Sequence, residues 1–394
     1  MGSNARVGRR SSQAVIVPVG CQLFRALFAG ILMLGGCVAG VKAESVSSPL
    51  AWNGEWILTL AAPPTSASVT LNLSADWVRA LAVTDQPSTG SKARWVGQLH
   101  VQARYQQEAG VDESTGGNGP LLRTDELWLQ LSRQGDSSSA WLRLGRQRFQ
   151  AGPVGLLVAN PFDAIAAAQA GLSFPRRHLM LTGVDGRLDT SYVTYLPYVW
   201  DQDSYRWLRV QGPRAGFTWL VDGLGSEQGL SWDMRSTGPE RSWVAEVALF
   251  RASRGADNYQ GWVGAAVASL DLAGSERYKV NLNVGSVHPG FTPMASNLAS
   301  AGGNLNFKNG STGLELNTSW LARPQWLLEN ESSLLWRFGW LDAQTLFRFT
   351  QAWRPGLQTV WELSWRPSSP IVTPRSPPDG RAQLAGQWQL RWQF

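Results

Sequence analysis

Cysteine is almost absent from this chain: it has two in 394 residues, Cys21 and Cys37, and both lie in the first 43 residues. The rest of the sequence therefore excludes disulfides, thiolate metal sites and cysteine nucleophiles. Histidine is also scarce, with three residues, and no Gly-x-Ser-x-Gly, His-x-x-x-His or phosphate-binding Walker motif occurs. We expect no enzyme activity, no cofactor and no metal site.

Long apolar runs are missing apart from one near the N-terminus, which excludes a bundle of membrane-spanning helices. That run, residues 26–40, follows a basic stretch and precedes a small-x-small motif ending at Ala43. This order is typical of a secretory signal peptide. We predict a signal peptide over 1–43 and one domain over 44–394.

Two alternative readings of the leader remain open. Leu34-Gly-Gly-Cys37 resembles a bacterial lipobox, in which Cys37 would be the lipidated N-terminus after cleavage. The pair Arg9-Arg10 resembles a twin-arginine signal, although the apolar run starts well downstream.

The body of the chain has no excess of positive or negative charge. The net charge of +6 comes mainly from five leader residues, and removing them leaves 30 bases against 29 acids. A nearly neutral body gives no basis for binding nucleic acid, so we expect no such partner.

What the body does show is alternation with a period of two residues, which predicts β-strands. Soluble sandwiches also alternate, but here the polar faces carry Arg, Glu, Asn and Gln at mid-strand, as a water-filled lumen would. We predict an all-β fold: a transmembrane antiparallel up-and-down β-barrel of 18 strands. A 16-strand alternative would merge short segments around 190–222.

An even strand number places both termini on one side, which in such barrels is the periplasm. The four longest predicted connections all follow odd-numbered strands, so all lie at the opposite, extracellular end: 108–121, 150–174, 288–310 and 367–382.

Tryptophan is abundant, with 21 residues, and it recurs toward strand ends, as in an aromatic girdle at the membrane surfaces. The chain also ends on Phe394, with apolar residues at every second position before it: Trp388, Leu390 and Trp392. This ending resembles the C-terminal signal read by the barrel-assembly machinery of Gram-negative bacteria. We therefore expect that machinery and outer-membrane lipid as partners, in the outer membrane.

The polar faces predict what lines the lumen. Parity assigns to it Arg104, Arg143, Arg277, Lys279, Arg337, Arg348, Arg366 and Arg391, with Glu315, Glu331 and Glu362. These charges could simply screen one another and keep the lumen hydrated. Alternatively, they form an arginine-rich passage for anionic or hydroxyl-bearing solutes, since the guanidinium fork binds carboxylates and its plane stacks on rings.

Segment 150–174 is the candidate constriction loop, with Gly152, Leu156, Leu157, Asn160, Phe162 and Asp163 as its main residues. It is too apolar to extend into water, and folding inward would stabilise it by about 1.5–3 kcal/mol per large apolar side chain. The alternative is that it packs on the outer rim or on a neighbouring subunit.

The stretch Leu142-Arg-Leu-Gly-Arg-Gln147, followed by Gly152 and by Asn160-Pro-Phe-Asp163, resembles the strand-and-loop pattern of alginate-export-type and related porin-like outer-membrane barrels. The resemblance covers about 60 residues and implies a passive or export conduit.

Together these features predict a porin-like channel for passive passage of small polar or anionic solutes. The alternatives are a polysaccharide export conduit and a scaffold barrel filled by a periplasmic or cytochrome partner. A homo-oligomer is possible, but no single apolar patch in the sequence marks an interface.

Overall fold

The computed structural model describes residues 51–393, except 63–65, 87–90, 111–120, 188–203, 224–225, 239–240, 253–260, 294–306, 308–309, 338–339 and 367–382. The predicted signal peptide and Phe394 therefore lie outside the described residues. In the part of the chain that is described, no helix is long and apolar enough to cross a membrane.

The described residues form strands throughout, with one short 3-10 turn, η3 (Pro175–Arg177). The strands are β1 (Ala51–Ala62), β2 (Ser66–Gln86), β3 (Ser91–Gly110), β4 (Leu121–Gln134), β5 (Ser139–Ala151), β6 (Val158–Phe174), β7 (Leu179–Arg187), β8 (Ser204–Gln211), β9 (Ala215–Asp222), β10 (Glu227–Thr237), β11 (Ser242–Ala252), β12 (Val263–Gly274), β13 (Tyr278–Val287), β14 (Ser311–Arg323), β15 (Trp326–Arg337), β16 (Trp340–Arg354), β17 (Leu357–Arg366) and β18 (Gln383–Gln393).

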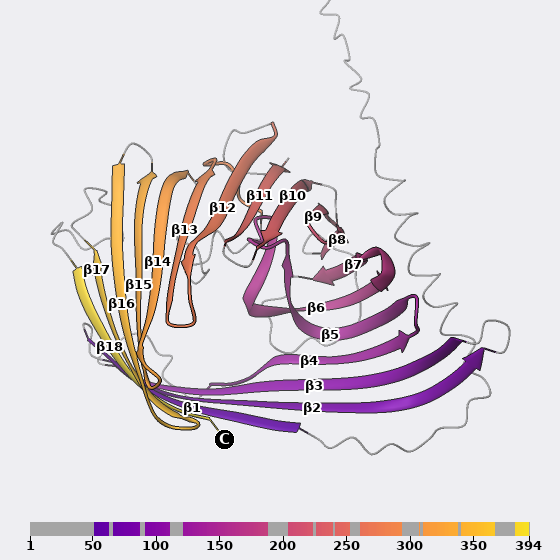
Figure 1. Cartoon of the computed structure of the whole chain (residues 1–394), viewed down its shortest axis with the longest axis horizontal. Coiled ribbons are helices and arrows are strands. Elements are labelled where there is room, and N and C mark those ends of the chain that lie inside the picture. Colours follow the sequence, from indigo (N-terminus) through magenta and orange to yellow (C-terminus); the bar gives the residue numbers. More distant parts are fainter. Residues whose placement is uncertain are drawn as a thin grey trace, which may run out of the picture. The chain divides into compact units, whose positions relative to one another are not determined.

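Each strand pairs antiparallel with its sequence neighbours, and β18 pairs with β1, which closes the sheet (Figure 1). At the closing seam Trp56 lies opposite Trp392, and Leu58 lies opposite Leu390. Closure satisfies every strand edge, as a barrel in lipid requires. The predicted fold class and the count of 18 strands are confirmed, and the 16-strand alternative is wrong.

One strand was misassigned by the sequence pattern. Residues 158–174, predicted as part of a loop, form β6 in the wall, between β5 and β7. The period-two signal is hidden there because Ile165 and Ala167 join an apolar cluster inside the barrel, so both faces of β6 are apolar. The strand predicted over 190–199 lies outside the described residues.

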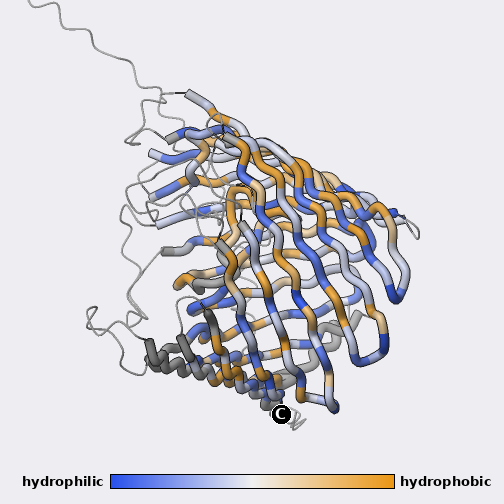
Figure 2. Tube along the Cα trace, turned by 90° about the vertical axis from the view of Figure 1, so that its left-hand side faces the viewer, coloured by the Kyte–Doolittle hydropathy of each residue, from blue (hydrophilic) through white to orange (hydrophobic). Residues whose placement is uncertain are grey.

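The two faces of the wall differ in chemistry, and residues alternate between them along the strands (Figure 2). On the outer face, large apolar side chains stay exposed in the isolated chain, including Trp232, Trp336 and Leu384 at 54–57%. Exposed apolar side chains on one continuous face are what a lipid-facing wall requires.

The strand connections also divide by side. Short turns follow β4, β6, β8, β12, β14 and β16, whereas the connections of ten or more residues follow β3, β7, β11, β13 and β17. All these long connections thus lie at one end of the barrel, but 150–174, which was predicted to be one of them, is not a long connection. The connection from β5 to β6, residues 152–157, has only six residues.

Candidate channel lumen

The turn 152–157 bends out of the wall into the barrel and reaches β10 and β11 (Figure 1). Leu156 and Leu157 are fully buried there, and Leu157 lies against Gly229 of β10, where a side chain on residue 229 would collide with it. The turn belongs to one apolar cluster inside the barrel with Phe250, Phe291, Phe307 and others. The cluster includes residues of β7, β8, β9, β11, β12 and β13, so the chain itself occupies part of the interior on their side.

A buried carboxylate holds the turn in place. Glu246 of β11 accepts hydrogen bonds from the backbone N–H groups of Val154 (3.1 Å), Gly155 (2.9 Å) and Leu156 (3.1 Å). Gly152 and Gly155 have φ of +92° and +74°, which only glycine adopts without strain. Three converging N–H donors form the kind of backbone concavity that binds anions, here occupied by a side chain of the same chain.

Beside the turn lies a cavity of about 320 Å³ whose charged lining is entirely basic: Arg143, Arg148, Arg209 and Arg235. Trp141, Trp207 and the backbone of Gly152 and Pro153 also line it. No carboxylate is among its lining residues.

The four arginines differ in how their charge is balanced. Arg209 is buried and pairs with Asp233 at 2.7 Å, and Arg148 pairs with Asp125 and Glu126 at 3.4 and 3.3 Å.

The other two bind uncharged groups. Arg143 donates to the Gln130 side chain at 2.8 Å and lies 4.0 Å over the Trp128 ring, while Arg235 donates to the backbone oxygens of Gly212 and Pro213. These described contacts are to neutral groups, and the carboxylate of Glu126, which pairs with Arg148, also interacts electrostatically with Arg143.

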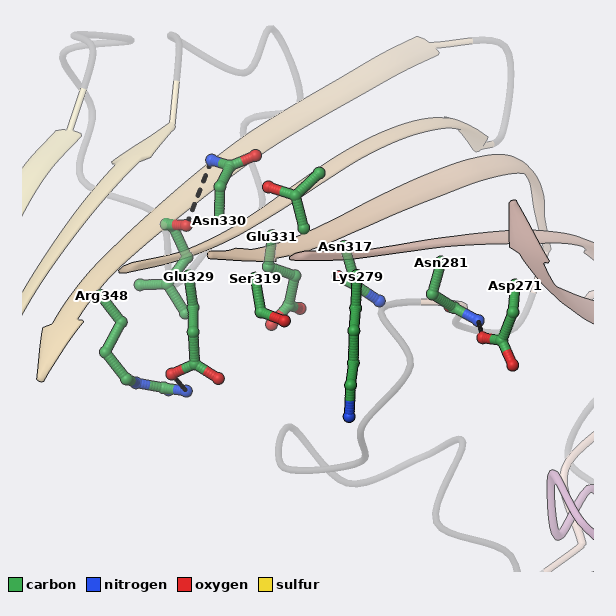
Figure 3. Close-up of a pocket in the computed structure, with 11 residues that line it drawn as sticks. Asp271, Lys279, Asn281, Asn317, Ser319, Glu329, Asn330, Glu331 and Arg348 are labelled. Atoms are coloured by element: carbon green, nitrogen blue, oxygen red, sulfur yellow. Dashed lines mark hydrogen bonds and ion pairs between the residues drawn. The ribbon is translucent and has the colours of Figure 1, made fainter. Parts of the chain in front are cut away.

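Strands β12–β16, on another part of the wall, carry both acidic and basic side chains. A second cavity, of about 360 Å³, is lined by Asp271, Lys279, Glu329, Glu331 and Arg348 among others (Figure 3). Arg348 donates two hydrogen bonds to Glu362, at 3.1 and 3.0 Å, and lies 3.6 Å from Glu329. Acids and bases on this wall therefore largely neutralise one another.

The predicted lumen residues fall into three groups. In the first group Arg104 pairs with Asp125 at 3.0 Å, Arg391 donates to Gln389, and Glu315 accepts hydrogen bonds from Asn283 and Asn317. Arg277 lies in the turn before β13 rather than on a wall strand, because β13 starts at Tyr278.

The third group cannot be placed. Arg337 and Arg366 end β15 and β17, and Asn160, Phe162 and Asp163 lie in β6, but their side chains are outside what the structure describes.

Several polar residues of the lumen escaped the sequence pattern. A bulge in β4, opposite Gln102 and Ala103, brings the consecutive residues Asp125 and Glu126 to the same set of basic partners. Arg209 shares its strand face with Tyr205 and Trp207, so period two does not mark that face as polar. The aromatic residues are instead part of the apolar cluster inside the barrel.

Among the described residues, no cluster of three or more His, Asp or Glu side chains is arranged to hold a metal ion.

Comparison with known proteins agrees with the fold. No protein-family profile and no curated protein sequence matches the chain. The crystal structure of OccAB4 from Acinetobacter baumannii matches with a TM-score of 0.54 at 8% identity, over 88% of this chain and 98% of that one.

OccAB2 from the same organism matches with a TM-score of 0.56 at 10% identity, over 88% and 97% of the two chains. OccK3 (OpdO) from Pseudomonas aeruginosa gives 0.56 at 10% identity, over 88% and 95%.

The closed 18-strand wall and these matches define the fold: the chain is a closed antiparallel β-barrel with the fold of OccAB4 and OccK3. The predicted barrel fold is confirmed, and the outer membrane remains its predicted location. The more specific resemblance to alginate-export barrels has no support in the comparisons.

Proposed function

We propose that this barrel is a passive channel for small polar and anionic solutes, which pass the inward turn 152–157 at the basic cavity. The observation that carries the proposal is the lining of that cavity: four arginines, no carboxylate and two tryptophan rings beside the turn. A concave site of one charge sign attracts the opposite ion, and guanidinium planes suit carboxylate and phosphate groups.

The inward turn supports a constriction at this level. It is held by Glu246 and by buried leucines, so the channel would run past the turn along the basic cavity. The same observation weighs against a scaffold barrel filled by a cytochrome or other partner, because the chain's own apolar cluster occupies part of the interior.

The test is ion selectivity in planar bilayers, measured as the reversal potential across a salt gradient. We expect the refolded protein to prefer anions, and the double variant Arg143→Gln/Arg235→Gln to lose about half or more of that preference. The matched control is Arg323→Gln, which removes a cation that lies over Trp326 beside a strand-end turn. Equal selectivity in the double variant and the wild type would refute the role of the cavity.

A further inference from the structure

A row of stacked side chains crosses β2–β5 and ends at the basic cavity. Asp76, His100 and Trp128 are register partners on β2, β3 and β4, strands that lie side by side (Figure 1). Nδ1 of His100 is 2.8 Å from Oδ1 of Asp76, and the His100 and Trp128 rings stack at 5.0 Å with an interplanar angle of 19°. The last member is Arg143 of β5, whose guanidinium carbon lies 4.0 Å from the centre of the Trp128 ring.

The Trp128 ring is fixed by its neighbours and is buried, with 8% of the residue exposed. Its Nε1 donates to Glu126 at 3.2 Å, and His100 stacks on the ring. Gly145 lies opposite Trp128 in the register of β4 and β5 and has φ of +126°. A Cβ on Gly145 would lie 2.8 Å from the Trp128 Cα, so the two backbones can approach this closely only with glycine at this position. Arg143 therefore meets a ring that has little freedom to move.

A second indole ring lies near the same guanidinium. Trp141, two residues earlier in β5, has its ring centre 5.7 Å from the guanidinium carbon of Arg143. The Trp141 ring lies on Gly171 of β6, where a Cβ would be 2.4 Å from the Trp141 Cε2. A cation within about 6 Å of an indole ring centre is attracted to the ring. Two rings thus hold one guanidinium.

The described hydrogen bond of Arg143 involves only one of its three nitrogens. Nε donates to the Gln130 side chain at 2.8 Å, and in the part of the chain that is described this is the only hydrogen bond of Arg143. Glu126, which interacts electrostatically with Arg143, is bonded to Trp128 and paired with Arg148 at 3.3 Å. Because Arg143 lines the basic cavity, its terminal N–H groups are available to a solute there.

We propose that Trp128 is a positioning residue, which fixes the plane of the Arg143 guanidinium so that its terminal N–H groups meet a planar anion with two oxygens. A guanidinium fork matches the two oxygens of a carboxylate, whereas a halide ion cannot accept two parallel hydrogen bonds at separate atoms. A side chain that is already held in one orientation also loses less conformational freedom when an anion binds.

The two residues then have separate effects. The charge of Arg143 favours anions over cations, and the stacking on Trp128 favours carboxylates over halides. This inference rests on the function proposed above, because it assumes that anions pass the basic cavity.

Two permeability ratios of the refolded full chain in planar bilayers separate these effects: chloride to potassium, and acetate to chloride. We expect Trp128→Leu to lower the acetate-to-chloride ratio by about threefold or more and to leave the chloride-to-potassium ratio close to that of the wild type. Trp128→Phe, which keeps an aromatic face, should retain most of the acetate preference. The matched control is Trp232→Leu, which removes a tryptophan of the outer face and should change neither ratio.

The variant Arg143→Lys tests whether Trp128 acts through Arg143. It keeps the charge but removes the planar fork, so it should lower the acetate-to-chloride ratio as Trp128→Leu does. Adding Trp128→Leu to Arg143→Lys should then lower the ratio no further. If Trp128→Leu does not fold, Trp141→Leu removes the more distant ring instead and should lower the same ratio by a smaller factor.

An unchanged acetate-to-chloride ratio in folded Trp128→Leu, or in Trp141→Leu where Trp128→Leu does not fold, would overturn this inference and leave the anion channel in place. An equal further loss when Trp128→Leu is added to Arg143→Lys would overturn it too. A wild type without anion preference would instead refute the proposed function, and this inference with it.

Discussion

A carboxylate oxygen of Glu246 lies 2.9 Å from the backbone nitrogen of Gly155, although 91 residues separate them in the sequence. The bond joins the turn between β5 and β6 to β11, across the inside of the barrel. With the bonds to Val154 and Leu156, it makes one buried side chain the anchor of the inward turn.

Removing this anchor should free the turn. Hydrogen bonds to a charged group contribute about 1.5–3 kcal/mol each, with losses that do not simply add. We expect Glu246→Ala to lower the free energy of unfolding by about 2–4 kcal/mol and to raise single-channel conductance with added current noise. Glu246→Gln, which keeps one acceptor oxygen, should show a smaller change in both. Unaltered conductance in folded Glu246→Ala would mean that the turn does not limit the current.

A side chain at position 152 should have the same effect by a different route. Gly152 has φ of +92°, and a Cβ there would lie 2.4 Å from a Glu246 carboxylate oxygen. We expect Gly152→Ala to destabilise the barrel by about 1–3 kcal/mol and to increase conductance. Gly274→Ala, where a Cβ would meet nothing within 4 Å, is the control and should behave as wild type in thermal unfolding and in bilayers.

The two best-defined ion pairs should differ in their effect on stability. Arg209 and Asp233 are 2.7 Å apart with side chains 9% and 2% exposed, whereas Arg348 and Glu362 are 38% and 26% exposed. Breaking a buried pair leaves an uncompensated charge and costs about 3–5 kcal/mol, while a more exposed pair contributes about 0–1 kcal/mol. Urea unfolding should therefore show a large loss for Asp233→Asn and a small one for Glu362→Gln. Similar losses for the two would contradict the burial of Asp233.

Closure of the wall predicts a specific disulfide. Leu58 and Leu390 are opposite each other where β1 meets β18, a separation that a disulfide can span. With Cys21 and Cys37 replaced by serine, Leu58→Cys/Leu390→Cys should form this bond and retain folded migration under non-reducing electrophoresis. Leu58→Cys/Leu384→Cys should not, because Leu384 pairs with Trp365 of β17. If Leu58→Cys/Leu390→Cys formed no disulfide, the sheet would be open between β1 and β18.

Period-two alternation was enough to predict the barrel and the number 18, but the predicted strands included 190–199 and left out β6. It succeeds where one face meets lipid and the other meets water, as along β18 with Trp388 and Trp392 opposed to Gln389 and Arg391. It fails where the inner face meets the chain's own apolar cluster. There Tyr205 and Trp207 point inward with Arg209, and the alanines of β6 show no contrast.

Only part of the candidate site could be predicted from the sequence, for the same reason. Leu156 and Leu157 were predicted to fold inward because they are apolar, and both are fully buried. The partner that fixes the turn, Glu246, lies on a distant strand, and nothing local in its sequence marks it as a ligand of backbone N–H groups. The pairing of Asp125 with Arg104 and Arg148 depends on a strand bulge, which shifts parity by one residue.

The most direct measurement is the single-channel current of the refolded wild-type barrel in a planar bilayer under a salt gradient. A channel narrowed at the basic cavity predicts stable open steps and a reversal potential on the anion-selective side. No open steps from protein that shows β-sheet and heat-modifiable migration, or a reversal potential on the cation-selective side, would contradict it.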